Sequence, residues 1–381
     1  MKIVIVSSYF GNVVGGALNF IIDLYTELES RGNLVTLVLD DRYKELFSEK
    51  KFHILWFSSA KITSYSPSLS LLRIISKIDA DVIHLHGYLS FQTDFGAIIG
   101  YLRKIPIILT PHGSLLGYEY LYDSSTSKLP YRIHDILTLK LPTKISKKII
   151  ATSQAEFRDC KKYGIPENKI KLIPLSFSPP DISKSEERTI KKTRLIFVGR
   201  IVPLKNLDIL LEAVKIVKKD IPEIEFIIVG EEISGRLYGD TGYKQKLESL
   251  IDVLEIKENI KFVGWKTGKE LWDVYQNSDL FLFASTYENF GLPLLEAAHF
   301  GLPLVSTDVG VAKDLIDENK GGSIISKLDA NEYAKKIITL LKNDLRYEGA
   351  SKFVSGEAKN FLIKSIAKKY EEIYSGCIKN E

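Results

Sequence analysis

The chain has 381 residues, more than one hydrophobic core usually supports, so we expect two domains. With 45% hydrophobic and 26% charged residues, its composition is that of an ordinary globular protein. The net charge of +4 is too small for a surface that neutralises many phosphates, so we do not expect nucleic acid as a partner.

The N-terminus and the cysteines indicate a cytoplasmic protein. Residues 1–6, Met-Lys-Ile-Val-Ile-Val, form an apolar run too short for a signal peptide and predict a first buried strand. No stretch approaches the roughly 20 apolar residues of a membrane helix. Cys160 and Cys377 lie far apart, which argues against a disulfide framework or a zinc site and fits a reducing compartment.

In the first half of the chain, short apolar runs alternate with amphipathic stretches. Such runs predict strands at 2–7, 34–39, 52–57, 81–86, 105–110, 148–152 and 170–173. Helices are expected at 17–30, 90–103 and 153–163. Strands that are apolar throughout and separated by helices predict a parallel sheet covered on both faces.

The same pattern restarts near residue 194. Strands are expected at 194–199, 225–230, 260–263, 279–284, 303–306 and 323–325. Helices fit 206–219, 241–255, 268–277, 293–300, 329–342 and 359–375. The chain therefore predicts a second parallel sheet of the same kind.

A linker separates the two halves. Pro179-Pro180 and the charged run 183–188 cannot form a buried element, since prolines block regular structure and charges resist burial. We predict an α/β protein with two Rossmann-like, doubly wound domains facing across a cleft. The boundaries are 1–178 for the N-terminal, acceptor-side domain, 179–193 for the linker, 194–358 for the C-terminal domain and 359–381 for a last helix that packs back toward the N-terminal domain.

Two glycines, Gly15 and Gly16, follow the first predicted strand. They lack the full G-x-G-x-x-G spacing, so a nicotinamide site is poorly supported. Glycine here would let the backbone approach a ligand closely before the next helix begins. A plain tight turn is almost equally compatible with the pair.

Two cations follow the strand at 194–199. Arg200 comes directly after Gly199, and Lys205 lies five residues further on. Ligands of doubly wound sheets bind at the carboxyl ends of strands, where Arg and Lys can hold a diphosphate and stabilise its charge as it leaves. Two solvated surface cations are the alternative.

The segment 288–296, Glu-Asn-Phe-Gly-Leu-Pro-Leu-Leu-Glu, follows another strand. Pro293 suits the first position of a helix, so the amides just before it would form an anion site. Glu288 and Glu296 can accept paired hydrogen bonds from vicinal hydroxyls. Together these features indicate a sugar nucleotide, whereas acidic residues that only complement the helix dipole are the alternative.

Three histidines lie at strand ends. His84 and His86 share one face of a strand, and His112 lies just past the next one. Catalytic groups often collect in such positions at the rim of a sheet. We do not expect a metal site at His84 and His86, because no carboxylate or Cys follows at a matching spacing.

A basic and partly apolar stretch runs from Lys128 to Lys148. Such a stretch can rest on an anionic membrane, so a peripheral contact at the cytoplasmic face is one expectation. A solvated helix face is the alternative.

With these motifs in place, the chain resembles the large family-four group of retaining glycosyltransferases, which have the GT-B fold. The resemblance covers nearly the whole chain. It depends on Gly15-Gly16, the His-Gly pairs at 86–87 and 112–113, Val198-Gly199-Arg200 with Lys205, and the Glu-x7-Glu motif from Glu288 to Glu296.

The resemblance implies transfer of a hexose from a nucleotide diphosphate sugar, of UDP-glucose or GDP-mannose type. The acceptor would be a hydroxyl of a glycan or a lipid-linked oligosaccharide, and the anomeric configuration would be retained. The family usually needs no metal, so we expect no cofactor beyond the donor. The residues that the resemblance places in catalysis are Glu288, His112, Arg200 and Lys205.

The resemblance also implies binding roles. Arg200 and Lys205 would neutralise the diphosphate, Glu288 would contact the transferred sugar, and Glu296 would bind the ribose. Further donor contacts would come from Gly15, Gly16, Val263, Gly264, Asn289, Phe290, Gly291 and Leu292. His86, Tyr118 and Tyr120 would lie on the acceptor side, although the tyrosines could equally be buried support.

One departure leaves the base open. Glu231-Glu232 stands after Gly230, where relatives often have Gly-Asp-Gly, so we cannot choose between uridine and guanosine. A sugar-nucleotide epimerase of the same fold is an alternative function. A non-catalytic sugar-binding subunit is another, but it would be expected to lack Glu288 or Lys205, and both are present.

Overall fold

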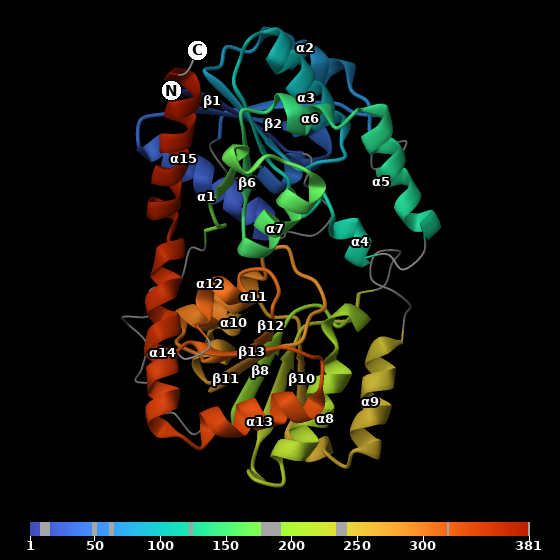
Figure 1. Cartoon of the computed structure of the whole chain (residues 1–381), viewed down its shortest axis with the longest axis vertical. Coiled ribbons are helices and arrows are strands. Elements are labelled where there is room, and N and C mark those ends of the chain that lie inside the picture. Colours follow the sequence, from blue (N-terminus) through green and yellow to red (C-terminus); the bar gives the residue numbers. More distant parts are fainter. Residues whose placement is uncertain are drawn as a thin grey trace. The chain divides into compact units, whose positions relative to one another are not determined.

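The computed structural model describes residues 1–7, 16–47, 52–60, 65–121, 125–176, 192–233, 242–317 and 320–379. The chain divides into two compact units (Figure 1). Met1–Ser176 and Phe361–Glu381 form the N-terminal unit, and Phe177–Asn360 forms the C-terminal unit.

A seven-stranded sheet lies at the centre of the N-terminal unit. Its order is β3-β2-β1-β4-β5-β6-β7, and every described pair of strands is parallel. The strands β4 and β5 are buried along their whole length, so helices must cover both faces of the sheet. The strands are β1 (Lys2–Ser7), β2 (Leu34–Asp40), β3 (Ile54–Phe57), β4 (Val82–His86), β5 (Ile107–Thr110), β6 (Lys148–Ala151) and β7 (Ile170–Leu172).

Serine caps explain where several helices of this unit begin. The hydroxyls of Ser68, Ser90 and Ser153 each accept the backbone N–H three residues further on, which satisfies an otherwise unpaired donor of the first turn. The helices are α1 (Gly16–Ser30), α2 (Leu69–Lys77), α3 (Phe91–Leu102), α4 (Gly117–Leu121), α5 (Ser125–Leu137), α6 (Leu141–Ile145), α7 (Gln154–Tyr163) and α15 (Ile363–Lys379). Short 3-10 helices lie at Asp41–Phe47 and Glu167–Lys169.

A six-stranded sheet lies at the centre of the C-terminal unit. Its order is β10-β9-β8-β11-β12-β13, again with parallel pairs throughout the described part. The strands are β8 (Arg194–Val198), β9 (Glu225–Val229), β10 (Ile260–Gly264), β11 (Leu280–Phe283), β12 (Leu304–Thr307) and β13 (Gly322–Ile325). Together with the first sheet, this confirms the predicted pair of Rossmann-like α/β folds.

Helices cover this second sheet in pairs, with α8 against α13 and α11 against α14. The helices are α8 (Leu207–Val217), α9 (Tyr243–Val253), α10 (Gly268–Gln276), α11 (Leu292–His299), α12 (Ala312–Leu315), α13 (Ala330–Leu341) and α14 (Asp344–Ala358). Short 3-10 helices lie at Pro203–Lys205, Lys257–Asn259 and Lys359–Phe361.

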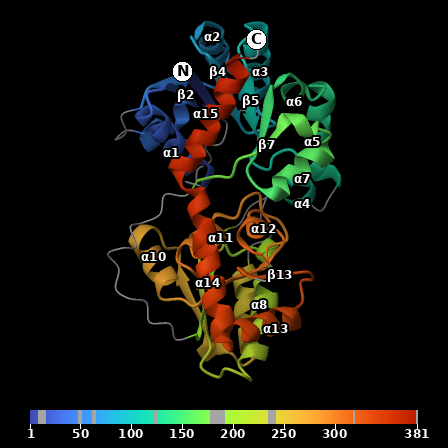
Figure 2. The same cartoon turned by 60° about the vertical axis from the view of Figure 1, so that its left-hand side comes forward.

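The last helix, α15, packs on the N-terminal unit beside α1 (Figure 2). Tyr370 and Tyr374 are fully buried there. Glu371 accepts a hydrogen bond of 2.6 Å from Asn33 and pairs with Arg31 at 3.3 Å. The final residues of the chain are therefore part of the first fold.

The helix predicted at 359–375 was wrong in its start, and α14 was not predicted. A 3-10 turn at Lys359–Phe361 separates α14 from α15, which begins at Ile363. The sequence did not indicate α14 because its buried positions, Tyr347, Ala350, Val354 and Ala358, include two alanines and no Leu or Ile. Its helical period is therefore weak in large apolar residues.

Among the described residues, no helix is both long and apolar enough to cross a membrane.

Candidate active site

The strand order of the C-terminal sheet reverses between β8 and β11. The strands after β8 extend the sheet on one side, and β11 begins the other side. In open parallel sheets, ligands bind outside the carboxyl ends of the strands at such a reversal. The segments 199–206 and 284–291, which follow these two strands, are therefore the first place to look for a ligand.

Hydrogen bonds hold these two segments together. The side-chain amide of Asn206 donates to the carbonyl of Ala284 at 2.7 Å and to the hydroxyl of Thr286 at 2.9 Å. The backbone N–H of Thr286 donates to the carbonyl of Leu204 at 3.0 Å. The segments thus form one rim, in which the side chains between them have defined positions.

Lys205 and Glu288 meet in this rim. Lys205 is only 5% exposed, and its Nζ forms an ion pair with Oε1 of Glu288. The hydroxyl of Ser285 also donates to Oε1 at 3.3 Å, and the ring of Phe283 lies 5.0 Å from Nζ. A buried ammonium needs such a partner because an unpaired charge is costly to desolvate. The structure therefore brings together two predicted site residues that are 83 positions apart in the chain.

Close backbone packing places Arg200 and the end of β10 beside this rim. A Cβ on Gly230 would lie 1.8 Å from the carbonyl oxygen of Gly199, so only glycine fits there. The N–H of Gly230 donates to the carbonyl of Gly264 at 2.9 Å. Arg200, which is half-buried, follows Gly199 directly. Val263 and Gly264, which the resemblance places among the donor contacts, thus lie at the same sheet edge as the two cations.

The N-terminus of α11 lies at the end of the second segment. Its N-cap is Gly291, with φ of 79°, and Pro293 stands in the first turn. Because glycine has no side chain, Gly291 cannot cap the first amides itself, which leaves that task to other groups. The backbone of Phe290 is held in place because the N–H of Val311 donates to its carbonyl at 2.7 Å. The segment from Asn289 to Leu292 is therefore a helix start of the kind that binds anions.

Glu296 lies one turn further into α11 and is 8% exposed. Burial raises the pKa of this carboxyl to about 7, although a hydrogen bond from Tyr275 opposes the shift. The Tyr275 hydroxyl donates to Oε2 at 2.8 Å, and the Tyr275 ring stacks on Phe300 at 5.6 Å. Tyr275 does not stand out in the sequence, because an aromatic residue on a helix ordinarily indicates core packing.

Glu232 has a structural task in this unit. One of its oxygens accepts the backbone N–H groups of Gly242, Tyr243 and Lys244 at 2.8, 2.6 and 3.2 Å. These are the first amides of α9, so Glu232 caps that helix from a distance. The Glu231-Glu232 pair, noted as a departure from the family pattern, is thus explained in part by local structure.

In the N-terminal unit, His86 and His112 form a buried pair at the carboxyl ends of β4 and β5. Nδ1 of His86 lies 2.8 Å from Nε2 of His112, and the rings stack at 5.1 Å. Burial lowers the pKa of His112 to about 4 and that of His86 well below its usual value. Both rings are therefore neutral at physiological pH, and a neutral His112 ring can donate one hydrogen bond and accept another.

A buried carboxylate, Glu156, holds the turn that contains His112. It accepts the N–H of Gly113 at 2.6 Å and both the N–H and the hydroxyl of Thr152 at 2.7 and 2.6 Å. His112 itself has a φ of 54°, which is uncommon for a residue other than glycine. Glu156 was not predicted as a site residue, although the spacing Ser153-x-x-Glu156 is that of a capping box.

The remaining predicted residues of this unit have varied surroundings. His84 is buried between Thr110 and Tyr374, each at 2.8 Å, so it links β4 to α15. Tyr118 is 8% exposed and stacks on Tyr131 at 4.5 Å, whereas Tyr120 is 40% exposed. Gly16 begins α1, and Gly15 lies outside the described residues.

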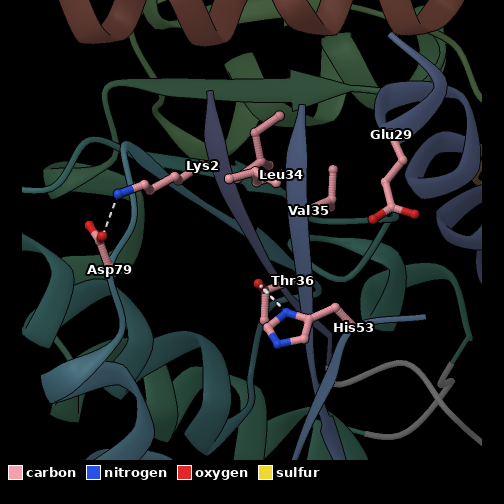
Figure 3. Close-up of a pocket in the computed structure, with 8 residues that line it drawn as sticks. Lys2, Glu29, Leu34, Val35, Thr36, His53 and Asp79 are labelled. Carbon is pink, nitrogen blue, oxygen red and sulfur yellow. Dashed lines mark hydrogen bonds and ion pairs between the residues drawn. The ribbon is translucent and has the colours of Figure 1, made fainter. Parts of the chain in front are cut away.

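A surface hollow of about 340 Å³ lies near the amino ends of strands β1 and β2 in the N-terminal sheet (Figure 3). Lys2, Leu34 and Thr36 line it near the starts of their strands, together with His53 and Asp79. Lys2 pairs with Asp79, and Thr36 bonds to His53 at 2.8 Å. Because ligands of parallel sheets bind at the carboxyl ends, this hollow is not part of the candidate site.

Within the ranges that the structure describes, no group of three His, Cys, Asp or Glu residues is arranged to hold a metal ion. The expectation of a metal-independent enzyme stays a prediction.

Two family models match the chain. The model described as "Glycosyltransferase Family 4" matches residues 14–177, and "Glycosyl transferases group 1" matches residues 180–356. The chain belongs to the family-four glycosyltransferases. Its two units therefore have the GT-B fold, and the rim described above lies in the group 1 half of this glycosyltransferase.

Two curated relatives match the glycosyltransferase over most of its length. The UDP-Gal:alpha-D-GlcNAc-diphosphoundecaprenol alpha-1,3-galactosyltransferase of Escherichia coli is 25% identical over 331 residues, which cover 82% of this chain and 80% of that one. The alpha-monoglucosyldiacylglycerol synthase of Acholeplasma laidlawii is 25% identical over 404 residues, which cover 99% and 98%.

A solved structure shows the same fold. The Anabaena protein HepE in complex with UDP superposes with a TM-score of 0.76 and 22% identity, covering 99% of this chain and 100% of that one. The structure of HepE in complex with UDP-glucose has a TM-score of 0.72.

Proposed function

We propose that this glycosyltransferase moves a hexose from a uridine diphosphate sugar to a hydroxyl of a glycan or a lipid-linked oligosaccharide, with retention of configuration and without a metal. The sequence left uridine and guanosine open. Uridine is favoured because the E. coli relative is named for UDP-Gal and the HepE structures contain UDP or UDP-glucose.

The donor diphosphate would bind between the two cations and the start of α11. Lys205 would exchange its contact with Glu288 for a phosphate oxygen, and Arg200 would add a second positive charge. The amides between Asn289 and Leu292 would donate to the phosphates. The same groups would stabilise the charge that develops on the leaving diphosphate, and this is where most of the rate acceleration would arise.

The sugar and the ribose would meet the two carboxylates of the motif. Glu288, released from Lys205, would accept hydrogen bonds from hydroxyls of the transferred sugar. Glu296 would accept the ribose hydroxyls through the oxygen that Tyr275 does not occupy. From the N-terminal unit, the neutral His112 would bond to the sugar. The acceptor hydroxyl would attack the face from which the diphosphate leaves and would give its proton to that phosphate.

The single observation that supports this proposal most strongly is the buried Lys205–Glu288 pair at the strand reversal. An ion pair that only stabilises the fold does not have to lie beside a helix N-terminus and a second cation, yet here all three features occur together. A diphosphate sugar needs all three, because its phosphates take the cations and amides and its hydroxyls take the carboxylate.

The test is incubation of the purified enzyme with UDP-glucose, UDP-galactose, UDP-N-acetylglucosamine and GDP-mannose, with and without a panel of lipid-linked acceptors. We expect UDP release that accompanies acceptor extension, with the product anomer matching the donor by NMR. Interconversion of the donor without an acceptor would identify an epimerase, and an inverted product would exclude retention.

A further inference from the structure

Helix α5 is rotated relative to an ordinary surface helix. An amphipathic helix of a globular protein usually buries its apolar residues and exposes its polar ones. In α5, Leu129 and the apolar residues four, seven and eight positions after it are exposed instead. They are Leu129 (51%), Ile133 (44%), Ile136 (70%) and Leu137 (78%), which we call the apolar stripe.

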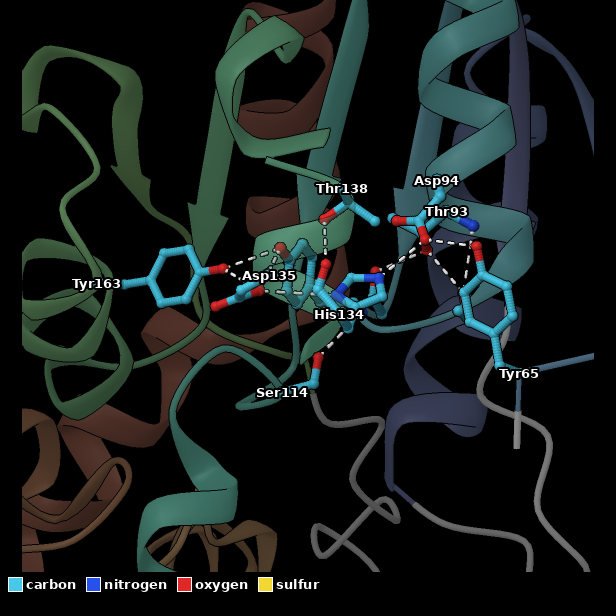
Figure 4. Close-up of polar contacts among 11 residues, drawn as sticks. Tyr65, Thr93, Asp94, Ser114, His134, Asp135, Thr138 and Tyr163 are labelled. Atoms are coloured by element: carbon cyan, nitrogen blue, oxygen red, sulfur yellow. Dashed lines mark hydrogen bonds and ion pairs between the residues drawn. The ribbon is translucent and has the colours of Figure 1, made fainter. Parts of the chain in front are cut away.

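The polar side of α5 faces its own unit. Within this fully described helix, His134 is the one buried residue. Its Nε2 lies 2.8 Å from Asp94 on α3, and its Nδ1 lies 3.6 Å from Asp135 (Figure 4). Burial alone would lower the pKa of His134, but the two carboxylates raise it to about 9. A positively charged ring between two acids therefore attaches the helix.

Aromatic residues complete this attachment. Oδ1 of Asp135 accepts the hydroxyl of Tyr88 at 2.9 Å and that of Tyr163 at 2.6 Å. The Tyr131 ring stacks on Tyr118 at 4.5 Å. If α5 turned to bury its apolar stripe, these buried polar groups would lose their partners, which costs more than the burial of a few aliphatic side chains returns. The exposed orientation is therefore fixed by the fold.

The stretch of chain that carries the stripe has a net positive charge. Residues 125–148 contain six Lys or Arg and one carboxylate, Asp135, which faces the tyrosines. Glu119 pairs with Lys128 and Arg132, so it neutralises part of this charge. Lys144 remains exposed. Exposed apolar groups on a stretch with net positive charge suit the interface of a bilayer that contains anionic lipids.

A second copy of the chain fits this surface less well. A stable dimer interface buries about 800 Å² from each partner. Four aliphatic side chains on one helix of 13 residues supply only part of that area. An isolated patch of this kind is still unusual for a surface that only meets water.

We propose that the apolar stripe of α5 inserts into the surface of a bilayer that contains anionic lipids. The enzyme would then work at the membrane without crossing it. The inference goes beyond the proposed transfer reaction and does not depend on which sugar is transferred.

The test is sedimentation of the full chain with vesicles of phosphatidylcholine alone and of phosphatidylcholine with about one-third phosphatidylglycerol. We expect binding to the anionic vesicles and at least a tenfold lower partition coefficient for the triple variant Ile133→Ser, Ile136→Ser, Leu137→Ser. The matched control is Leu69→Ser, Val253→Ser, Leu345→Ser, which removes three aliphatic residues that are 83%, 78% and 85% exposed elsewhere. This control should bind as the wild type does.

Equal vesicle binding by the α5 variant and the wild type would overturn the proposal, as would a wild type that binds neither kind of vesicle. A wild-type dimer in light scattering that only the α5 variant converts to a monomer would overturn it in favour of a second copy. Neither donor nor acceptor is present in these measurements, so their failure leaves the proposed transfer reaction untouched.

Discussion

At the scale of single residues, the carboxylates of the Glu-x7-Glu motif have different surroundings. Glu288 pairs with an ammonium, whereas the nearest partner of Glu296 is the neutral hydroxyl of Tyr275. The motif alone would suggest two equivalent acids. Because Glu296 is buried with a neutral hydroxyl as its hydrogen-bond partner, its protonation depends on pH near neutrality and on Tyr275.

This difference predicts pH-dependent donor binding. In the proposed donor site, ribose hydroxyls would donate to the ionised form of Glu296, and its pKa of about 7 means that acid removes this form. UDP affinity, measured by calorimetry, should therefore rise as the pH increases from 6 to 8. Tyr275→Phe removes the hydrogen bond that lowers the pKa of Glu296, so burial raises this pKa further. We therefore expect UDP to bind about tenfold more weakly at pH 7, as for loss of one hydrogen bond to a charged group.

A second buried tyrosine provides the control for that experiment. The Tyr333 hydroxyl donates to the carbonyl of Phe283 at 2.8 Å rather than to Glu296. Tyr333→Phe should lose a comparable amount of stability while keeping the pH dependence of the wild type. If Tyr275→Phe and Tyr333→Phe gave the same pH profile for UDP binding, Tyr275 would have no role in positioning Glu296.

At the scale of elements, the loops after β8 and β11 matter more than the strands themselves. The sequence predicted both strands, because runs such as Leu-Phe-Leu-Phe at 280–283 are buried on both faces. It also placed Lys205 and Glu288 after them. It could not show that Asn206 ties the two loops together, since such contacts depend on three-dimensional packing between distant segments.

Asn206 therefore offers a test of the rim. Asn206→Ala should remove the bonds to Ala284 and Thr286 and lower the free energy of unfolding by about 1–3 kcal/mol. Asn206 has a φ of 47°, so Ala also adds backbone strain. Asn206→Gly relieves that strain without restoring the bonds. We expect the free energy of unfolding and the transfer rate of Asn206→Gly to lie between those of Asn206→Ala and the wild type. A fully active and fully stable Asn206→Ala variant would contradict the role of Asn206 in joining the two loops.

Buried histidines predict how the N-terminal unit responds to acid. Burial lowers the pKa of His84 to about 3, so the unfolded chain binds a proton between pH 6.5 and 3 that the folded chain does not. The free energy of unfolding is therefore unaffected by this histidine above pH 6.5. Below that pH it falls, by up to about 1.4 kcal/mol per pH unit for each such histidine. Urea unfolding of His84→Gln should show a shallower loss between pH 6 and 4, and an unchanged slope would contradict the prediction.

At the scale of the whole molecule, the sequence predicted two Rossmann-like folds and the family correctly, but not every helix. Periodic apolar runs identify buried strands, whereas α14 has too few large apolar residues to stand out. The orientation of α5 was equally hidden, because the same amphipathic pattern fits a buried and an exposed stripe. Only the polar partners of His134 and Asp135 decide between them.

The central claim is that Lys205 and Glu288 form the donor-diphosphate site of this glycosyltransferase. It is tested most directly by UDP binding to Lys205→Ala, compared with Lys342→Ala, whose exposed lysine pairs with Asp220 far along the chain. We predict at least tenfold weaker binding for Lys205→Ala, as for the loss of one charged hydrogen bond, and no change for Lys342→Ala. Equal UDP affinity for Lys205→Ala and wild type would contradict the claim.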